Sequence, residues 1–253
     1  MQLEQGDRLE SENKDFIRTK IPSYEKIWGI YVGHDGNGRM TDIPNLKNDI
    51  KEQRVKFAEH NYTCVESLIC MKKIADTLQP ITQFTMDAYL NVLNGLMAFH
   101  AHAGRIRDNS NKILIVLNCN ESVRSNILPK FENIYQQRNV IVHGKRLPLI
   151  VKEGYYLIAP PMGNEELHNK WRSEMNWEDF NNDDFEYMEE YLRNTLDAIC
   201  GGYNSLLFNV FGIIKNIVQE NSISIINSTN IKPKCYGLQG PQGAIISGST
   251  INN

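Results

Sequence analysis

Long stretches of apolar residues spaced three and four apart constrain the fold of this chain more than any other feature. One stretch runs from Val55 to Leu78 before Pro80, and a second runs from about Thr85 to Arg107. This spacing places apolar side chains on one face of an α-helix, and proline ends such a pattern. A chain of 253 residues with 41% hydrophobic residues can bury these faces in a helical bundle.

A third helix is predicted to end near His143. Pro129 suits its first turn, and Gly144 is the residue type expected in the left-handed position just after a helix. Between the second and third helices, residues 113–117 are apolar throughout. Their period does not distinguish a strand from a buried turn of helix.

A last long helix is predicted near the C-terminus. Asp183 and Glu186 form a plausible capping pair for it, and its pattern runs to about Gln219 with a kink or interruption at Gly201-Gly202. Residues 221–253 are rich in Ser, Asn, Gly and Ile without a helical period. They are therefore predicted to form a flexible tail.

Two segments favour β-structure. Ile27–Val32 is typical of a short strand, Asn37-Gly38 of a hairpin turn, and Met40–Ile43 of a returning strand. Residues 147–159 are typical of a β-hairpin or extended excursion. The predicted fold class is therefore mainly α, a helical bundle with a small N-terminal β-hairpin and a short β excursion after the third helix. The predicted organisation is an extension (1–50), a helical domain (51–220) and a flexible tail (221–253).

Composition narrows the compartment and the partners. The net charge is −3 with a pI near 6.1, so nothing global indicates nucleic acid or membrane binding. The five cysteines are widely spaced without a C-x-x-C pair, which favours a reducing compartment over a disulfide framework. Residues 2–20 hold no apolar signal core, and the apolar runs are too short to cross a bilayer. We expect a cytoplasmic protein without membrane contact.

Arg138 is the anomaly of the third helix. Phe131, Ile134 and Ile141 form an apolar stripe, and Arg138 occupies the position in it where an aliphatic residue belongs. A guanidinium at the edge of a core is costly unless an anion or hydrogen-bond acceptors meet it.

Two further polar residues share this helix. Asn139 and His143 are four residues apart and therefore lie on one helix face, next to Arg138. His143 can give or take a proton near neutral pH, and the arginine can bind a phosphate bidentately. This pairing suits phosphodiester cleavage, in which one group moves protons and the other meets the developing charge.

The segment from Tyr135 to Gly144, YQQRNVIVHG, resembles the signature of HEPN domains: an arginine, a polar residue that is often asparagine, three more residues, and a histidine at a helix end. The resemblance loosely covers residues 51–220. It implies an α-helical bundle, commonly a homodimer, that acts as a metal-independent endoribonuclease in toxin–antitoxin or phage-defence systems. It further implies that Arg138, Asn139 and His143 form the catalytic set, that two protomers build one composite site, and that an antitoxin partner exists.

Less specific interpretations stay open at this point. Arg138 can extend from the core edge to solvent, and His143 can serve as an ordinary C-terminal cap. Arg54 and His60 form a second arginine–histidine match, but Val55 fills the polar slot and the pair opens a helix. Even a true HEPN domain can be a non-catalytic RNA- or nucleotide-binding module or adaptor.

Local charge favours a phosphate partner such as RNA or a nucleotide. Residues 133–152 contain no acid, and the candidate substrate-binding cations there are Lys145, Arg146 and Lys152. Segment 165–190 carries ten acids. A basic cleft and two solvated faces explain this sorting equally well. Tyr155 and Tyr156 are candidates for base stacking, although core or interface packing is the favoured explanation of both.

No metal site or cofactor is expected. His100 lies on the apolar stripe of the second helix and His102 points elsewhere, whereas a metal pair on one helix face requires a spacing of three or four. His100 is therefore predicted to be a core or interface histidine. The chain holds no Walker-type or G-x-G-x-x-G phosphate loop.

Overall fold

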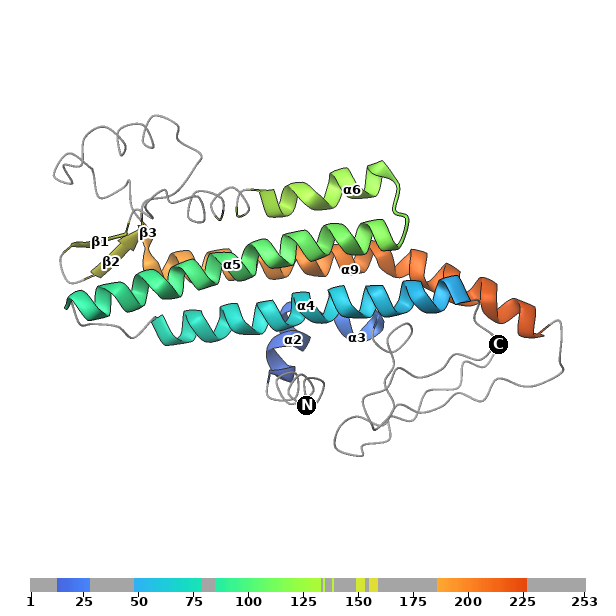
Figure 1. Ribbon diagram of the computed structural model, residues 1–253, viewed down its shortest axis with the longest axis horizontal. Coiled ribbons are helices and arrows are strands. Elements are labelled where there is room, and N and C mark those ends of the chain that lie inside the picture. Colours follow the sequence, from blue (N-terminus) through green and yellow to red (C-terminus); the bar gives the residue numbers. More distant parts are fainter. Residues whose placement is uncertain are drawn as a thin grey trace. The chain divides into compact units, whose positions relative to one another are not determined.

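The computed structural model describes residues 13–27, 48–78, 85–132, 134, 138, 149–152, 155–158 and 186–226. Three long helices dominate these residues (Figure 1): α4 (Asn48–Leu78), α5 (Met86–Val116) and α9 (Met188–Ile226). The shorter helices are α2 (Lys14–Lys20), α3 (Ser23–Ile27) and α6 (Glu121–Ile127), and the last continues into the 3-10 helix η2 (Leu128–Phe131). The strands are β1 (Leu149–Lys152), β2 (Tyr155–Ile158) and β3 (Glu186–Tyr187). A mainly helical chain with a small antiparallel sheet is thus confirmed.

The chain divides into two compact units. The first unit comprises Met1–Glu66, Asn109–Arg124 and Tyr203–Asn253, and the second comprises Ser67–Asp108 and Ser125–Gly202. Among the described helices, none combines the length and apolarity needed to span a lipid bilayer. The cysteines of the described segments, Cys64, Cys70, Cys119 and Cys200, are free thiols.

The first unit packs α2 and α3 onto a core from the long helices. Its buried apolar residues include Ile17, Ile21, Ile27, Phe57, Ile113, Leu114, Leu206, Leu207 and Val210. The backbone N–H of Ser23 donates to Asn204 Oδ1 at 2.9 Å, which ties the start of α3 to α9. The fully buried Tyr203 hydroxyl donates to Asn61 Oδ1, and burial holds the pKa of Tyr203 well above its ordinary value.

The second unit buries a regular apolar stripe of α5, whereas Met86, Leu90 and Met97, which the sequence pattern also placed on the apolar face of this helix, are exposed. The buried members are spaced alternately four and three residues apart: Val92, Leu96, Phe99, Ala103 and Ile106. They share this core with residues of the other elements: Leu68, Met71, Phe131, Leu149, Ile158, Tyr191, Leu192 and Ile199. This unit contains the whole sheet and Arg138.

Local signals set both ends of α5. Its start is capped by Thr85, whose Oγ1 accepts from the N–H of Ala88 at 3.2 Å, and the helix thus begins close to the predicted position. Beyond its end at Val116, Asn118 adopts a φ of 50°, a left-handed conformation that asparagine tolerates. The N–H of Cys119 then bonds back to the carbonyl of Leu114 at 2.9 Å. The helix therefore continues well past Arg107, and the segment 113–117, left open above, is helical through Val116.

The sheet has the order β1-β2-β3, with both pairings antiparallel. Leu149 stands opposite Ile158, and Lys152 stands opposite Tyr155. The predicted β excursion is thus confirmed in β1 and β2. The third strand was not predicted, and the capping role given to Glu186 is wrong: this residue pairs with Ile158 in β3, and α9 begins only at Met188.

Other predicted boundaries also differ. Helix α4 starts at Asn48 rather than Val55, and α9 includes residues 221–226 of the predicted tail. The expected interruption is absent, since α9 runs through Gly201-Gly202 as a continuous helix. A Cβ placed on Gly202 would lie 3.1 Å from the Phe131 ring, so this glycine makes room for a core side chain.

The predicted N-terminal hairpin lies almost wholly outside the described residues. Its first residue, Ile27, belongs to helix α3 rather than to a strand. Residues 28–47 and 227–253 are not among those described, so the hairpin and the distal tail stay predictions.

Candidate functional site

Arg138 lies at the edge of the second unit's core, as its place in the stripe predicted. Phe131 and Ile134 are buried, with 1% and 8% of their surfaces exposed. Arg138 follows one turn after Ile134, is helical and is half-buried. An arginine therefore does occupy an apolar stripe here, with its side chain partly withdrawn from solvent.

Gly104 of α5 provides the space for this arginine. A Cβ built on Gly104 would lie 3.0 Å from Cγ and Nε of Arg138 and 3.1 Å from its Cδ. Atoms in ordinary van der Waals contact are about 3.5–4.0 Å apart, so a larger residue at this position would require the arginine stem to shift by a few tenths of an ångström. The stem of Arg138 is thus laid against the backbone of α5 at the one place in that turn where no side chain intervenes.

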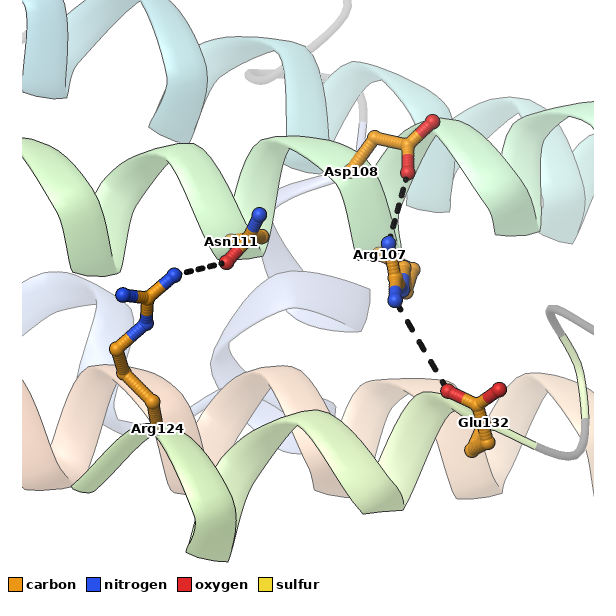
Figure 2. Close-up of polar contacts among 5 residues, drawn as sticks. All are labelled: Arg107, Asp108, Asn111, Arg124 and Glu132. Atoms are coloured by element: carbon orange, nitrogen blue, oxygen red, sulfur yellow. Dashed lines mark hydrogen bonds and ion pairs between the residues drawn. The ribbon is translucent and has the colours of Figure 1, made fainter. Parts of the chain in front are cut away.

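An ion pair lies one turn further along α5 (Figure 2). Arg107 Nη2 is 3.9 Å from Glu132 Oε2, and Nη1 is 3.4 Å from Asp108 Oδ1. These side chains are partly exposed, so the pair contributes little stability, about 0–1 kcal/mol. Its consequence is electrostatic: Arg107, one turn after Gly104, offsets part of the negative charge of the two carboxylates.

Figure 2 also draws a polar contact of the first unit. Arg124 of α6 donates from Nη2 to Asn111 Oδ1 of α5 at 3.3 Å. It links two helices of that unit and is no part of the candidate site.

His100, one turn before Gly104, is fully buried and fixes α5 against α9. Its Nε2 lies 2.8 Å from the hydroxyl of Tyr191, which is itself 3% exposed. Burial lowers the pKa of His100 to about 4, so the ring is neutral at neutral pH, and burial raises the pKa of Tyr191. The prediction of a core histidine is confirmed. A neutral ring without solvent access is suited to positioning α5 rather than to exchanging protons with a substrate.

The remaining predicted site residues are only partly covered by the structure. Asn139, His143, Lys145 and Arg146 lie outside the described residues, so their roles stay predictions. Lys152 is the last residue of β1 and pairs with Tyr155 in the ladder. In the described ranges, no three His, Cys, Asp or Glu side chains gather closely enough to hold a metal ion.

The two tyrosines of β2 have different environments. Tyr156 is 4% exposed and belongs to the core, whereas Tyr155 is 57% exposed. The Tyr155 ring packs edge-on against Tyr187 of β3, with centroids 5.3 Å apart and an interplanar angle of 77°. Tyr187 is itself 50% exposed. The sequence did not single out Tyr187, because a two-residue strand has no recognisable alternation.

The second arginine–histidine match, Arg54 with His60, lies within the first unit. Arg54 is 4% exposed, and His60 Nδ1 lies 3.0 Å from Asn109 Oδ1 across the bundle. Arg54 and His60 both lie inside α4, which begins at Asn48, so the prediction that this pair opens a helix is wrong.

Gly104 is the site residue that the sequence reasoning missed. The available signal was a glycine inside a long helical pattern, which costs about 1 kcal/mol relative to alanine and usually has a packing reason. Comparison with protein-family models, curated protein sequences and solved structures finds no match to this chain.

Proposed function

We propose that this protein is a metal-independent endoribonuclease of HEPN type, with Arg138, Asn139 and His143 as its catalytic set. The observation that carries the proposal is the close packing of the Arg138 side chain against Gly104 of α5. Because Gly104 has no side chain, the arginine stem can lie against the helix backbone instead of extending into solvent. A guanidinium that must present its planar fork to a phosphate benefits from a stem held against a rigid helix.

The chemistry follows from these side chains. His143, as general base, takes the proton of the ribose 2′-hydroxyl, whose oxygen attacks the adjacent phosphorus. The bond to the 5′-oxygen breaks, and the leaving oxygen receives a proton from a general acid, the role that the second protomer's histidine would fill in a composite dimeric site. Arg138 stabilises the negative charge on the phosphorane-like oxygens, and Asn139 orients His143 or the phosphate. The products are a 2′,3′-cyclic phosphate and a 5′-hydroxyl.

Charge along the chain supports a phosphate substrate. The acid-free stretch 133–152 contains Arg138, and the carboxylates of Asp108 in α5 and of Glu132, just after η2, interact with Arg107. Their negative charge is thereby partly offset, which lowers the repulsion that an approaching RNA backbone would meet. Lys145, Arg146 and Lys152 are the proposed substrate-binding residues of this stretch.

Cleavage of end-labelled RNA by the purified protein in excess EDTA tests the proposal. Wild-type protein should cleave, while Arg138→Ala and His143→Ala should each lose at least about 100-fold in rate, as expected for charge stabilisation and proton transfer. His60→Ala, taken from the second arginine–histidine pair, is the matched control and should retain activity. Binding of RNA without cleavage by the wild-type protein would instead favour a non-catalytic RNA- or nucleotide-binding module.

A further inference from the structure

Helix α5 presents an exposed face in the second unit that carries no charged side chain. Between Asp87 and Arg105 the helix contains no aspartate, glutamate, lysine or arginine. The exposed residues of this stretch form what we call the uncharged α5 face: Leu90, Asn91, Asn94, Met97, Ala98 and Ala101. A solvated helix face normally carries charges, whereas the core of a protein interface is depleted of them.

The uncharged α5 face differs from the exposed faces of its neighbours. In the same unit α4 and α9 expose charged residues: Lys73, Asp76, Glu189, Glu190, Arg193 and Asp197. On α5, Leu90 and Met97 instead keep 45% of their surfaces exposed, and Met86, next to Asp87, keeps 71%. Methionine is a residue type enriched in protein interfaces. The face therefore has the composition of a contact surface.

The charges at the two ends of this face indicate the kind of partner. Asp87 and Arg105 are both exposed, and from 87 to 105 is 18 residues. Because this is about five turns of an α-helix, the two side chains lie on one line along α5, about 27 Å apart. Two copies of α5 packed antiparallel, with their two-fold axis at the level of residue 96, bring Asp87 of each copy opposite Arg105 of the other. Parallel packing would instead place like charges opposite each other, which is unfavourable.

The same antiparallel register also matches the residues between the ends. Positions equally far from residue 96 face each other across the two-fold axis, so Asn91 lies opposite Ala101, and Asn94 lies opposite Ala98. Each larger side chain thus meets a smaller one, which lets two helices approach to the usual distance of about 8–10 Å. The face is therefore self-complementary in size and in charge, as an interface between two identical surfaces requires.

We propose that the uncharged α5 face binds the same face of a second copy of this chain, in an antiparallel two-fold dimer closed at both ends by Asp87–Arg105 pairs. This interface rests on α5 alone and is independent of the proposed nuclease function. Each copy contributes a helix face about 27 Å long and about 10 Å wide. Such a face is smaller than the roughly 800 Å² per partner of a standard interface, so we expect a dimer that dissociates in the micromolar range.

Sedimentation velocity of the full-length protein at low salt, from about 1 to about 100 µM, tests the dimer without reference to RNA cleavage. The wild-type protein should shift from monomer towards dimer over this range. Met97→Glu places two carboxylates beside the two-fold axis and should raise the dimer Kd about tenfold or more. Phe208→Glu is the matched control: it introduces the same charge at an apolar residue of the first unit that is 69% exposed, and it should leave the Kd unchanged.

A charge swap tests the antiparallel register. Asp87→Lys and Arg105→Glu each place like charges opposite each other at both ends of the dimer. Each single variant should weaken the dimer about tenfold, because two-fold symmetry repeats every contact. The double variant, Asp87→Lys with Arg105→Glu, restores opposite charges and should return the Kd to within about threefold of the wild type. Far-UV circular dichroism of each variant checks that the helices are intact.

A wild-type protein that stays monomeric up to about 100 µM would overturn the proposed dimer. A Met97→Glu variant that dimerises like the wild type would place the contact elsewhere and overturn the assignment to α5. A double charge-swap variant that binds no more tightly than the single variants would exclude the antiparallel register. If RNA is not cleaved while the dimer behaves as expected, the nuclease proposal fails and the interface stands.

Discussion

Replacing Gly104 with alanine tests directly whether the Arg138 side chain packs against Gly104 of α5. In a helix interior the change from glycine to alanine normally stabilises the fold by about 1 kcal/mol. At this position the new methyl would lie 3.0 Å from two atoms of Arg138, and relief of such overpacking costs about 1–3 kcal/mol. The sum predicts a Gly104→Ala protein whose stability is unchanged or lower by up to about 2 kcal/mol.

Two controls isolate this contact: the same substitution at another glycine, Gly201, and Gly104→Ala in an Arg138→Ala background. Gly201 of α9 is exposed, and a Cβ built on it meets no heavy atom of the described structure within 4 Å. Gly201→Ala should therefore raise stability by the full helix-propensity gain, about 2–4 °C in Tm for a chain of this size. In an Arg138→Ala background, Gly104→Ala should stabilise by a similar amount, because the methyl no longer meets the arginine.

The assay is thermal unfolding followed by far-UV circular dichroism, applied to the single variants and the double variant. The difference between the effect of Gly104→Ala with and without Arg138 is a coupling energy, which the contact predicts to be about 1–3 kcal/mol. If Gly104→Ala raised Tm as much as Gly201→Ala does while Arg138 is present, the close contact between Gly104 and Arg138 would be refuted.

Three further predictions concern RNA cleavage by Gly104→Ala, the pKa of His100, and the buried hydrogen bond between Tyr203 and Asn61. Gly104→Ala should slow RNA cleavage, by about tenfold or more, because misplacing a catalytic group by about 1 Å reduces rates by up to about 100-fold; cleavage at the wild-type rate would contradict this. The pKa of His100, about 4 in the folded protein against 6.5 ordinarily, means that the unfolded chain binds the extra proton between these pH values. Stability should therefore fall by about 2 kcal/mol from about pH 7 to about pH 5 in urea titrations, and His100→Gln should lack this component; an equal pH dependence in both proteins would exclude it. Tyr203→Phe should reduce the free energy of unfolding by about 1–3 kcal/mol because it leaves buried Asn61 polar atoms unpaired, and adding Asn61→Leu should recover part of that loss.

The helices were predictable because their cores repeat with the helical period. Val92, Leu96, Phe99 and Ala103 alternate at four and three residues, and Thr85 caps the helix that contains them. The ends were less predictable. Asn109 and Ser110 are polar yet buried, so the sequence pattern of α5 fades where the helix continues. Asn109 contacts His60, a residue distant in sequence that the local pattern of α5 does not reveal.

The errors near β3 and Gly201-Gly202 have tertiary causes. Glu186 fits a helix start by spacing, but its backbone completes a ladder with Ile158, a partner 28 residues earlier in the chain. Glycine is a residue type that often breaks helices, but Gly202 instead makes room for the Phe131 ring. Both outcomes depend on contacts with residues distant in sequence, and local secondary-structure propensities do not contain that information.

The candidate site was half visible in the sequence. Arg138 stood out as a charge in an apolar stripe, and its half-buried place in the second unit agrees with that. The glycine that accommodates it lies 34 residues earlier, on a helix that shares no motif with it. Tyr155 was a candidate for stacking, but its separation from Tyr156 required the register of β1 and β2.

The central claim, that RNA is cleaved through its 2′-hydroxyl with the help of Arg138 and His143, is tested most directly by the ends of the product. We would incubate wild-type protein in EDTA with a labelled RNA and with its 2′-O-methyl counterpart, and identify the new termini by mass. The account predicts 2′,3′-cyclic phosphate and 5′-hydroxyl ends from the RNA, with the methylated strand intact. Cleavage of the methylated strand, or products with 3′-hydroxyl and 5′-phosphate ends, would contradict it.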